Sequence, residues 1–336
     1  MALITSNTAW AGAPPRSHAA KAVLRASVLE GVAFGVFVGL GESYITAFAL
    51  AAGASPLVVS LIASLPVFLA AGAQLAEDRM VRVLGGRRRA VVCFAALQAL
   101  AVGAYAVSGV ARPAGLPWLL IALAALYALF GAVIAPAWGG IMADLVPPQL
   151  RGRYFALRSQ LSTLAMVVSF IGAGAFLNQV VDHALWGFAI VFGAAALARG
   201  ASWLLLRRLP SDGALSTRPR RQHVAPSETD ASARVIRRFI VFMFAMHFCV
   251  NISGPFFVYY QLRELEISYL WFSLLQAVAS MATLLAVRRW GRFADKAGNR
   301  LGLVVASLLL PAIPLLWIPF PHVGAFMVAQ VLSGVA

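Results

Sequence analysis

An acidic residue lies near the middle of the first long apolar run of the chain. Glu42 follows Gly31, Gly35 and Gly39 and precedes Thr46, at steps of three or four residues that predict one shared helix face. Glycines on such a face let a neighbouring helix approach closely. A lone carboxylate within a bilayer costs about 3 kcal/mol or more, so it is expected to face a partner or water. Glu42 could therefore take up a coupling proton, or it could be a structural carboxylate bonded to a neighbouring hydroxyl group.

A second candidate group lies in the apolar run that follows the basic middle of the chain. His247, Asn251 and Gly254 occur at steps of four and three residues, and Pro255 offers a kink. A histidine in this position could titrate near physiological pH. The alternative is that His247 and Asn251 form hydrogen bonds to a neighbouring helix.

The next apolar run contains a regular row of polar residues. Tyr269, Ser273, Gln276, Ser280 and Thr283 recur at steps of four and three, so they share one face of a helix. Such a row lines a solute pathway or bonds to another helix, and we expect cavity lining. The candidates for solute binding or proton coupling are therefore Glu42, His247, Asn251, Tyr269, Ser273 and Gln276.

The residue patterns of common enzymes do not occur. Cys93 and Cys249 lie in apolar runs without a C-x-x-C pair, and the five histidines are scattered. Neither Lys21 nor Lys296 belongs to a G-x-x-x-x-G-K-[ST] motif, which excludes a P-loop ATPase. An intramembrane enzyme would need converging acids, a nucleophile–base pair or metal-spaced histidines. We therefore expect no enzyme activity, no cofactor and no metal site.

The composition requires a bilayer as the solvent of the fold. The 336 residues are 61% hydrophobic and 12% charged, with a mean hydropathy of +0.83. A membrane-spanning helix needs about 20 apolar residues. The fold class is predicted to be an all-α polytopic transmembrane helix bundle of about ten helices. The predicted spans are 28–51, 56–77, 90–111, 116–142, 155–181, 184–206, 238–261, 267–287 and 301–320, and a tenth from Val323.

The net charge of +15 is distributed very unevenly. Of 27 lysines and arginines, all but Arg112 and Arg263 fall on one side of the predicted membrane, and this assignment places Arg199 with the cations of that side. The positive-inside rule then puts the N-terminus and the basic linker in the cytoplasm, in an inner-membrane protein. The charge thus predicts topology rather than nucleic-acid binding. The expected partners are the lipid bilayer and a small-molecule solute, with H⁺ as the candidate coupling ion, and the chain is expected to be a monomer.

The chain divides into two related halves. We predict a cytoplasmic tail at 1–24, a six-helix half at 25–209, a basic linker at 210–236 and a second half at 237–336. Shifting the chain by 213 residues superimposes two polar turns, Asp78–Arg87 and Gly291–Arg300, each between apolar runs. A parallel duplication explains this spacing. The shift also pairs Ser55 with Ser268, Ser60 with Ser273, and Gly85 with Gly298.

The second polar turn carries a family signature, G-x-x-x-D-[RK]-x-G-[RK]-[RK]. Asn299 departs from it, and in the first turn Arg82 stands where the acid belongs, with Asp78 one helical turn earlier. On these residues the chain, from Arg25 to Ala336, resembles the major facilitator superfamily, whose members have two six-helix halves. The residues that match in the second turn are Gly291, Asp295, Lys296, Gly298 and Arg300.

The resemblance implies a secondary transporter that works by alternating access. It also implies that charged residues at the cytoplasmic ends of the helices form ion pairs in one conformation and release them in the other. The implied gating residues are Asp78, Arg82, Gly85, Arg87, Gly291, Arg292, Asp295, Lys296, Gly298 and Arg300, with a third cluster of Asp144, Arg151 and Arg153.

By the repeat, a second six-helix half would close near residue ~420, so the chain is expected to be a truncated form. The alternatives to a transporter are a non-transporting remnant of such a permease and an intramembrane enzyme.

Overall fold

The computed structural model describes residues 18–180, 184–210, 230–317 and 322–335. All regular structure in these segments is helical, so the predicted all-α class is confirmed. Most of the predicted tail (1–24) and of the predicted linker (210–236) lies outside the described residues. Eight described helices have the length and hydropathy of membrane spans, and Arg300–Leu316 and Val323–Val335 are shorter apolar segments.

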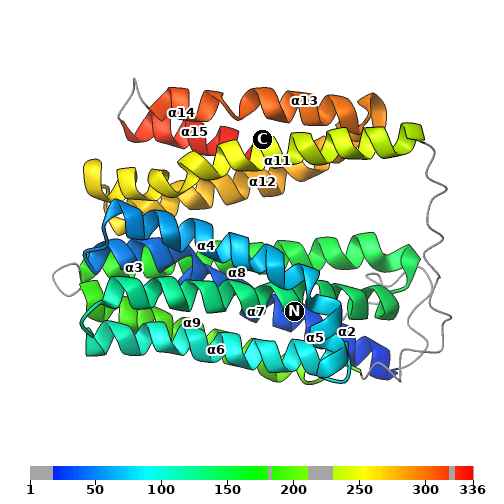
Figure 1. Cartoon of the computed structure of the whole chain (residues 1–336), viewed down its shortest axis with the longest axis horizontal. Helices are drawn as coiled ribbons and strands as arrows, with labels where there is room; N and C mark the ends of the chain where they lie inside the picture. The colour runs from blue at the N-terminus through cyan, green and yellow to red at the C-terminus, as the bar shows by residue number, and fades with distance from the viewer. Residues whose placement is uncertain (1–17, 181–183, 211–229, 318–321, 336) are drawn as a thin grey trace.

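The helices form two groups, which Figure 1 shows one above the other. The first group contains α2 (His18–Leu40), η2 (Glu42–Tyr44), α3 (Ile45–Ala51), α4 (Pro56–Leu75), α5 (Glu77–Val83), α6 (Arg87–Ala111), α7 (Leu116–Leu145), η3 (Pro148–Leu150), α8 (Arg151–Gln179) and α9 (Ala184–Leu206). The second contains α11 (Asp230–Tyr259), the π-helical turn η5 (Tyr260–Glu264), α12 (Tyr269–Ala297), α13 (Asn299–Leu309), α14 (Ala312–Trp317) and α15 (Val323–Val335).

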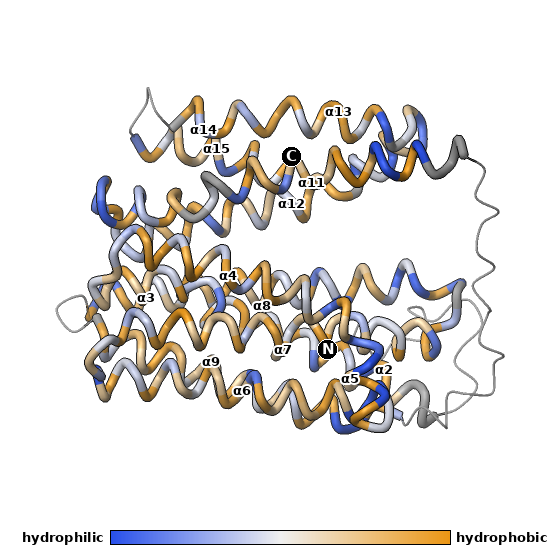
Figure 2. The backbone as a smooth tube through the Cα atoms, in the orientation of Figure 1, coloured by the Kyte–Doolittle hydropathy of each residue, from blue (hydrophilic) through white to orange (hydrophobic). Residues whose placement is uncertain are grey.

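The bundle has two chemically distinct ends. We call the end with α5 and the α12–α13 junction the basic end, and the end with α3 and η5 the far end. Figure 2 shows hydrophilic backbone gathered at α5 and at the ends of α11 and α13, while the lengths between are largely hydrophobic. The ribbons of the two groups lie close together at the far end and apart at the basic end (Figure 1).

The internal repeat is visible in how matching helices begin. Ser55 and Ser268, which are 213 residues apart, are the N-caps of α4 and α12. Each serine hydroxyl accepts a hydrogen bond from the backbone N–H three residues later. Gly85 and Gly298 both have positive φ, at 74° and 84°, where glycine is favoured. The paired serines are therefore both helix N-caps, and the paired glycines both adopt positive φ.

The glycines of α2 allow a neighbouring helix to approach closely, as their spacing predicts. A Cβ atom on Gly35 would lie 2.1 Å from the Ser162 carbonyl oxygen, and one on Gly39 would lie 2.3 Å from that of Met166. The α2 and α8 backbones are therefore in direct contact, and only glycine fits there. The prediction that Glu42 shares this face is wrong, because α2 ends at Leu40 and the chain continues as the 3₁₀ turn η2.

The second polar turn is much shorter than the predicted ten residues. Helix α12 continues to Ala297, and α13 begins at Asn299, so only Gly298 separates them. Asp295 and Lys296 therefore belong to the last turn of a helix. Hydropathy ends a predicted span where charges begin, but a helix can continue into the headgroup region because its polar residues are solvated there.

The predicted ninth span is interrupted. Helix α13 ends at Leu309 and α14 begins at Ala312, so the break falls at Leu310 and Pro311. Proline has no N–H to donate and its ring disfavours helical geometry in the preceding residue.

Candidate functional site

The first membrane segment breaks next to its acidic residue. Glu42 and Tyr44 bound the 3₁₀ turn between α2 and α3. The Tyr127 hydroxyl group of α7 donates a hydrogen bond to Glu42 Oε2. The Glu42 side chain is otherwise exposed. A short 3₁₀ stretch within a helix often marks a hinge, and broken membrane helices surround the binding sites of many transporters. The turn therefore places a carboxylate with one neutral partner at the break in the membrane segment.

Tyr44 connects this turn to the second group of helices. Its side chain is fully buried, and its hydroxyl group donates to the Phe170 carbonyl oxygen at 2.8 Å. The Tyr44 Oη and Ser273 Oγ atoms lie 2.6 Å apart, and either can donate. Ser273 also bonds to the Tyr269 carbonyl oxygen at 2.7 Å. The Tyr44 and Ser273 hydroxyl groups have two hydrogens for three close oxygen contacts. The Tyr44–Ser273 contact is the one that joins the two groups of helices.

Aromatic rings surround the Tyr44 contact. The ring centroids of Phe170 and Phe272 lie 4.8 and 6.1 Å from that of Tyr44, and Phe188 packs edge-on against Tyr269 at 5.5 Å. Arg263 of η5 adds a polar contact, because its Nη2 donates to the Leu50 carbonyl oxygen at 2.7 Å. The far end of the interface is therefore held by apolar packing and a few directional hydrogen bonds.

The other sequence candidates lie apart from this contact. His247 and Asn251 are exposed on α11, and their side chains bond to carbonyl groups of the same helix. Gln276 accepts a hydrogen bond from Gln330 of α15 at 3.0 Å. Ser280 bonds within α12. The structure thus brings Tyr269 and Ser273 to the helix break, and it uses Gln276 to join two helices of the second group.

A buried polar network in the first group was missed by the sequence reasoning. Arg199 is 1% exposed, and its guanidinium group donates to Gln98 Oε1 at 2.8 Å and to Ser202 Oγ at 2.6 Å. Ser202 donates to Glu30 Oε1 at 2.8 Å, and Glu30 Oε2 pairs with Arg158 Nη2 at 2.6 Å. The network therefore crosses from α9 through α6 and α2 to α8.

Arg199, which the sequence count placed with the cations of the basic side, is buried inside the helix bundle rather than in a loop. Arg199 lies seven positions before the end of α9, which is roughly 10 Å along the helix axis. The count of cations by loop did not single out this residue. An arginine within the apolar run 184–206 nevertheless indicates a charge that is buried among helices. Glu30, twelve residues before Glu42, carried the same signal.

One pair of the predicted gating residues is in contact. Arg87 Nη1 and Asp144 Oδ2 lie 3.2 Å apart at the basic end, with both side chains partly exposed. An exposed pair of this kind contributes about 0–1 kcal/mol. Nearby, partial burial and the Asp78 carboxylate raise the pKa of Glu77, and Arg87 opposes this shift.

The remaining gating candidates are dispersed over the basic end. Arg151 donates to the Ala143 and Val146 carbonyl oxygens and so caps the end of α7. Arg82, Arg153, Gly291, Arg292, Asp295, Lys296 and Arg300 are exposed.

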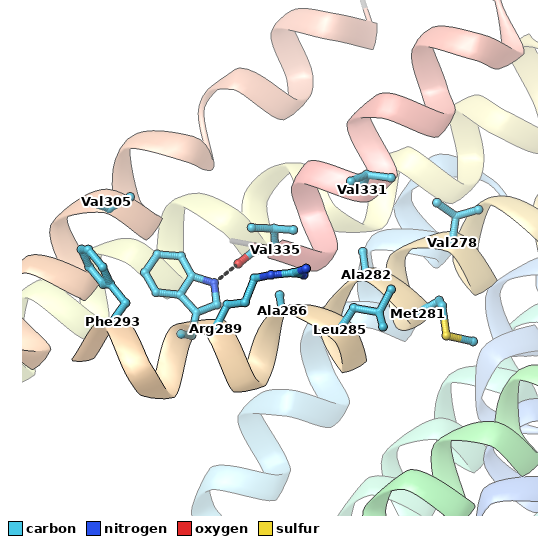
Figure 3. Close-up of a pocket in the computed structure, with 11 residues that line it drawn as sticks. Val278, Met281, Ala282, Leu285, Ala286, Arg289, Phe293, Val305, Val331 and Val335 are labelled. Atoms are coloured by element: carbon cyan, nitrogen blue, oxygen red, sulfur yellow. Dashed lines mark hydrogen bonds between the residues drawn. The ribbon is translucent and has the colours of Figure 1, made fainter. Parts of the chain in front are cut away.

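The large cavity of the second group lies away from Glu42. It measures about 600 Å³, and its walls are Arg289 and apolar residues of α12, α13 and α15. The Trp290 indole donates to the Val335 carbonyl oxygen beside it (Figure 3). Ala286 of its wall corresponds to Ala73 by the 213-residue shift. Ala73 packs against Val133 of α7 in the first group. The cavity therefore matches a space that α7 fills in the first half, and it is not a candidate solute site.

Two groups of membrane-length helices that meet at a polar helix break define a multi-pass integral membrane protein of the transporter class. The family described as Major Facilitator Superfamily matches residues 27–336, so the chain belongs to that superfamily and is a membrane transporter by family. A comparison with curated proteins finds no match.

Two solved structures show the same fold. The nucleoside transporter NupG aligns with a TM-score of 0.55 and 13% identity over 95% of this chain and 79% of NupG. A bacterial homologue of the human lysosomal transporter Spinster, in an inward-facing and occupied conformation, aligns with a TM-score of 0.57 and 17% identity. That alignment covers 96% of this chain and 72% of the homologue.

Proposed function

We propose that the protein is a secondary active transporter that moves a small solute by alternating access. The observation that carries the proposal is the Tyr44–Ser273 contact, which joins the two halves at a break in the first membrane segment. Phe272 of α12 packs in the same apolar core as Tyr44, and a rotation of two helix groups about their interface can repack contacts of this kind as a set. The positive-inside rule supports a cytoplasmic basic end.

Alternation would exchange the far-end contacts for contacts at the basic end. In the present conformation Tyr44 and Arg263 hold the far end together. Opening it requires the Ser273 and Leu50 partners to be released. Asp295 and the cations around it would then be available to close the basic end, as the family resemblance implies.

Glu42 is the proposed coupling acid. Its ionised form accepts the Tyr127 hydroxyl hydrogen bond, and its protonated form carries no charge through the membrane interior. A change of protonation would therefore alter both the charge at the hinge and the hydrogen bond that holds it. The alternative is a structural carboxylate that keeps Tyr127 in place.

The coupling role can be tested in proteoliposomes with an imposed pH gradient. The solute would first be chosen by thermal stabilisation of the purified chain, beginning with nucleosides because one structural relative transports them. Glu42→Gln is expected to abolish uptake driven by the gradient and to leave solute exchange intact, since glutamine still accepts the Tyr127 hydrogen bond. Glu264→Gln, at an exposed acid of η5, is the matched control. Driven uptake that survives in Glu42→Gln would contradict the coupling role.

A second test concerns Asp295. If its carboxylate helps to close the basic end in the alternate conformation, Asp295→Asn should favour the present conformation. A cysteine placed at the buried Leu50, after Cys93 and Cys249 are replaced by serine, would then react more slowly with a maleimide. The expected change is roughly two- to fivefold, as for one partly solvated ion pair. Equal labelling rates with and without the substitution would reject the latch.

A further inference from the structure

The apolar cavity between α12, α13 and α15 has a cation on its wall. Its volume of about 600 Å³ is within the range of about 300–1,000 Å³ that is usual for small-molecule pockets. Arg289 is the only charged residue among the described residues that line it. In Figure 3 the Arg289 side chain extends over Ala286, with its guanidinium group directed toward Ala282. The cavity therefore presents a positive charge to its occupant.

The depth of Arg289 fits the boundary between hydrocarbon and headgroups of a bilayer. The apolar span of α12 ends at Val287, and Arg289 lies two positions further, which is about 3 Å along the helix axis. Trp290 follows, and tryptophan is enriched at this boundary. Met281 and Leu285 of the apolar wall belong to the span itself and are exposed, so the cavity is open. An apolar space and a cation at headgroup depth therefore meet in one open cavity.

Arg289 has no acidic partner in the part of the chain that the structure describes. Its guanidinium group forms no ion pair or hydrogen bond there. Residues 288–300 contain a single acid, Asp295, which is exposed. A cation directed into apolar surroundings is unfavourable unless an anion accompanies it. An anionic group is therefore expected beside Arg289, and further exposed cations surround the position: Arg292, Lys296 and Arg300.

The first half of the chain has neither the cation nor the space. By the 213-residue shift, Ala76 corresponds to Arg289. Ala73, which corresponds to Ala286, packs against Val133 of α7. The arginine therefore occurs in the half in which the space beside this position is open.

The charges of this surface disfavour a second copy of the chain as the occupant. A two-fold contact through the cavity would bring Arg289 and the cations around it close to the same cations of the other copy. Like charges that face each other across an interface oppose association. The occupant is therefore expected to be anionic as well as apolar.

An anionic phospholipid combines these two properties. Its phosphate can accept hydrogen bonds from a guanidinium group in a bidentate arrangement, and its acyl chains are hydrocarbon. Anionic lipids give the cytoplasmic leaflet its negative surface potential, and the positive-inside rule supports a cytoplasmic basic end.

We propose that the cavity binds an anionic phospholipid of the bilayer, with its phosphate on Arg289 and one acyl chain along the apolar walls. The lipid occupies this site whether or not the chain moves a solute. Loss of the lipid site and loss of transport are therefore separate results.

Trp290 is a natural reporter of the cavity. The full chain is reconstituted in phosphatidylcholine vesicles in which a minor fraction of the lipid carries a nitroxide near the headgroup end of one acyl chain. The labelled lipid is either phosphatidylglycerol or phosphatidylcholine. Of the eight tryptophans, Trp290 is assigned by the quenching that is lost in Trp290→Phe. Phosphatidylglycerol should half-quench Trp290 at an about fivefold lower fraction, as about 1 kcal/mol for one cation near an anionic lipid gives.

The phosphate contact is tested at Arg289, which is exposed, so its replacement removes no buried packing. In Arg289→Gln the two labelled lipids should quench Trp290 at similar fractions. Arg289→Lys keeps the charge and should retain most of the preference. Arg79→Gln, at an exposed arginine of α5, removes the same charge from the first group and should leave the preference unchanged.

The acyl-chain contact is tested on α15. Val331 lines the cavity, whereas Val328 is exposed one turn earlier and is not part of its lining. Val331→Phe narrows the apolar space and should raise the fraction of phosphatidylglycerol that half-quenches Trp290. Val328→Phe should not change it.

Four results would overturn the proposal. Equal quenching by the two lipids in the parent chain would show no preference for the anionic headgroup, and equal losses in Arg289→Gln and Arg79→Gln would show only general surface charge. No quenching of Trp290 by either lipid would show that protein covers the cavity. Relief of the quenching by millimolar inorganic phosphate would indicate a site for free phosphate instead of a lipid.

Discussion

Glu30→Gln is expected to lower the free energy of unfolding by about 3–5 kcal/mol, the usual loss when one partner of a buried ion pair is removed. Glu30 is 4% exposed and bonds through both carboxylate oxygens, to Arg158 and to Ser202. Glutamine keeps the shape but leaves two guanidinium groups without an anion. The loss would appear as a lower midpoint of thermal unfolding in detergent.

The order of the two losses, for Glu30→Gln and for Arg158→Gln, tests the network more sharply than the size of either loss. Arg158→Gln should be less harmful than Glu30→Gln, since Glu30 then remains with one cation, Arg199, instead of two. Combining the two substitutions should cost less than the sum of their separate effects, because they remove opposite charges from one network. Glu264→Gln, at an exposed acid, should change stability by no more than about 0.5 kcal/mol. If Arg158→Gln were the more damaging variant, Glu30 would not be the anion that Arg158 and Arg199 share.

The amino-acid sequence was sufficient to predict the architecture because hydropathy and small-residue spacing act locally. The spans follow from run length, and the glycine steps predicted a close approach of a neighbouring helix to α2, which the structure identifies as α8. The shift of 213 residues paired Ser55 with Ser268, and the structure shows that both are helix N-caps. These features depend on residues close together in the chain.

The candidate site was only partly predictable, since its contacts join distant segments. Glu42 could be singled out as an intramembrane acid, but Tyr127 as its partner could not. The 3₁₀ turn at Glu42 changes the direction of the side chain, and a regular 3.6-residue helix count cannot anticipate it. The sequence shows that Arg199 interrupts an apolar run, but it does not show that Gln98 and Ser202 are its partners.

The contact between the halves depends on one glycine of α8. A Cβ atom on Gly174 would lie 1.9 Å from Ser273 Oγ and 2.7 Å from the Tyr269 carbonyl oxygen. Gly174→Leu therefore cannot keep the far-end contact, even if the Ser273 side chain rotates away. Because the obstruction lies between the two groups rather than within one of them, the groups should separate at the far end while each keeps its own packing.

Gly174→Leu is expected to shift the conformational equilibrium by about 3 kcal/mol, which is on the order of 100-fold. A cysteine at Leu50, in a background without Cys93 and Cys249, should then react with a maleimide far faster than in the parent chain. Gly172→Leu is the matched control, because a Cβ atom there meets nothing within 4 Å on the same helix. Similar labelling rates in the two variants would show that the Gly174–Ser273 contact does not hold the far end closed. A faster labelling rate in Gly174→Leu than in Gly172→Leu would show that the effect comes from the contact with Ser273 and not from a larger side chain at any position of α8.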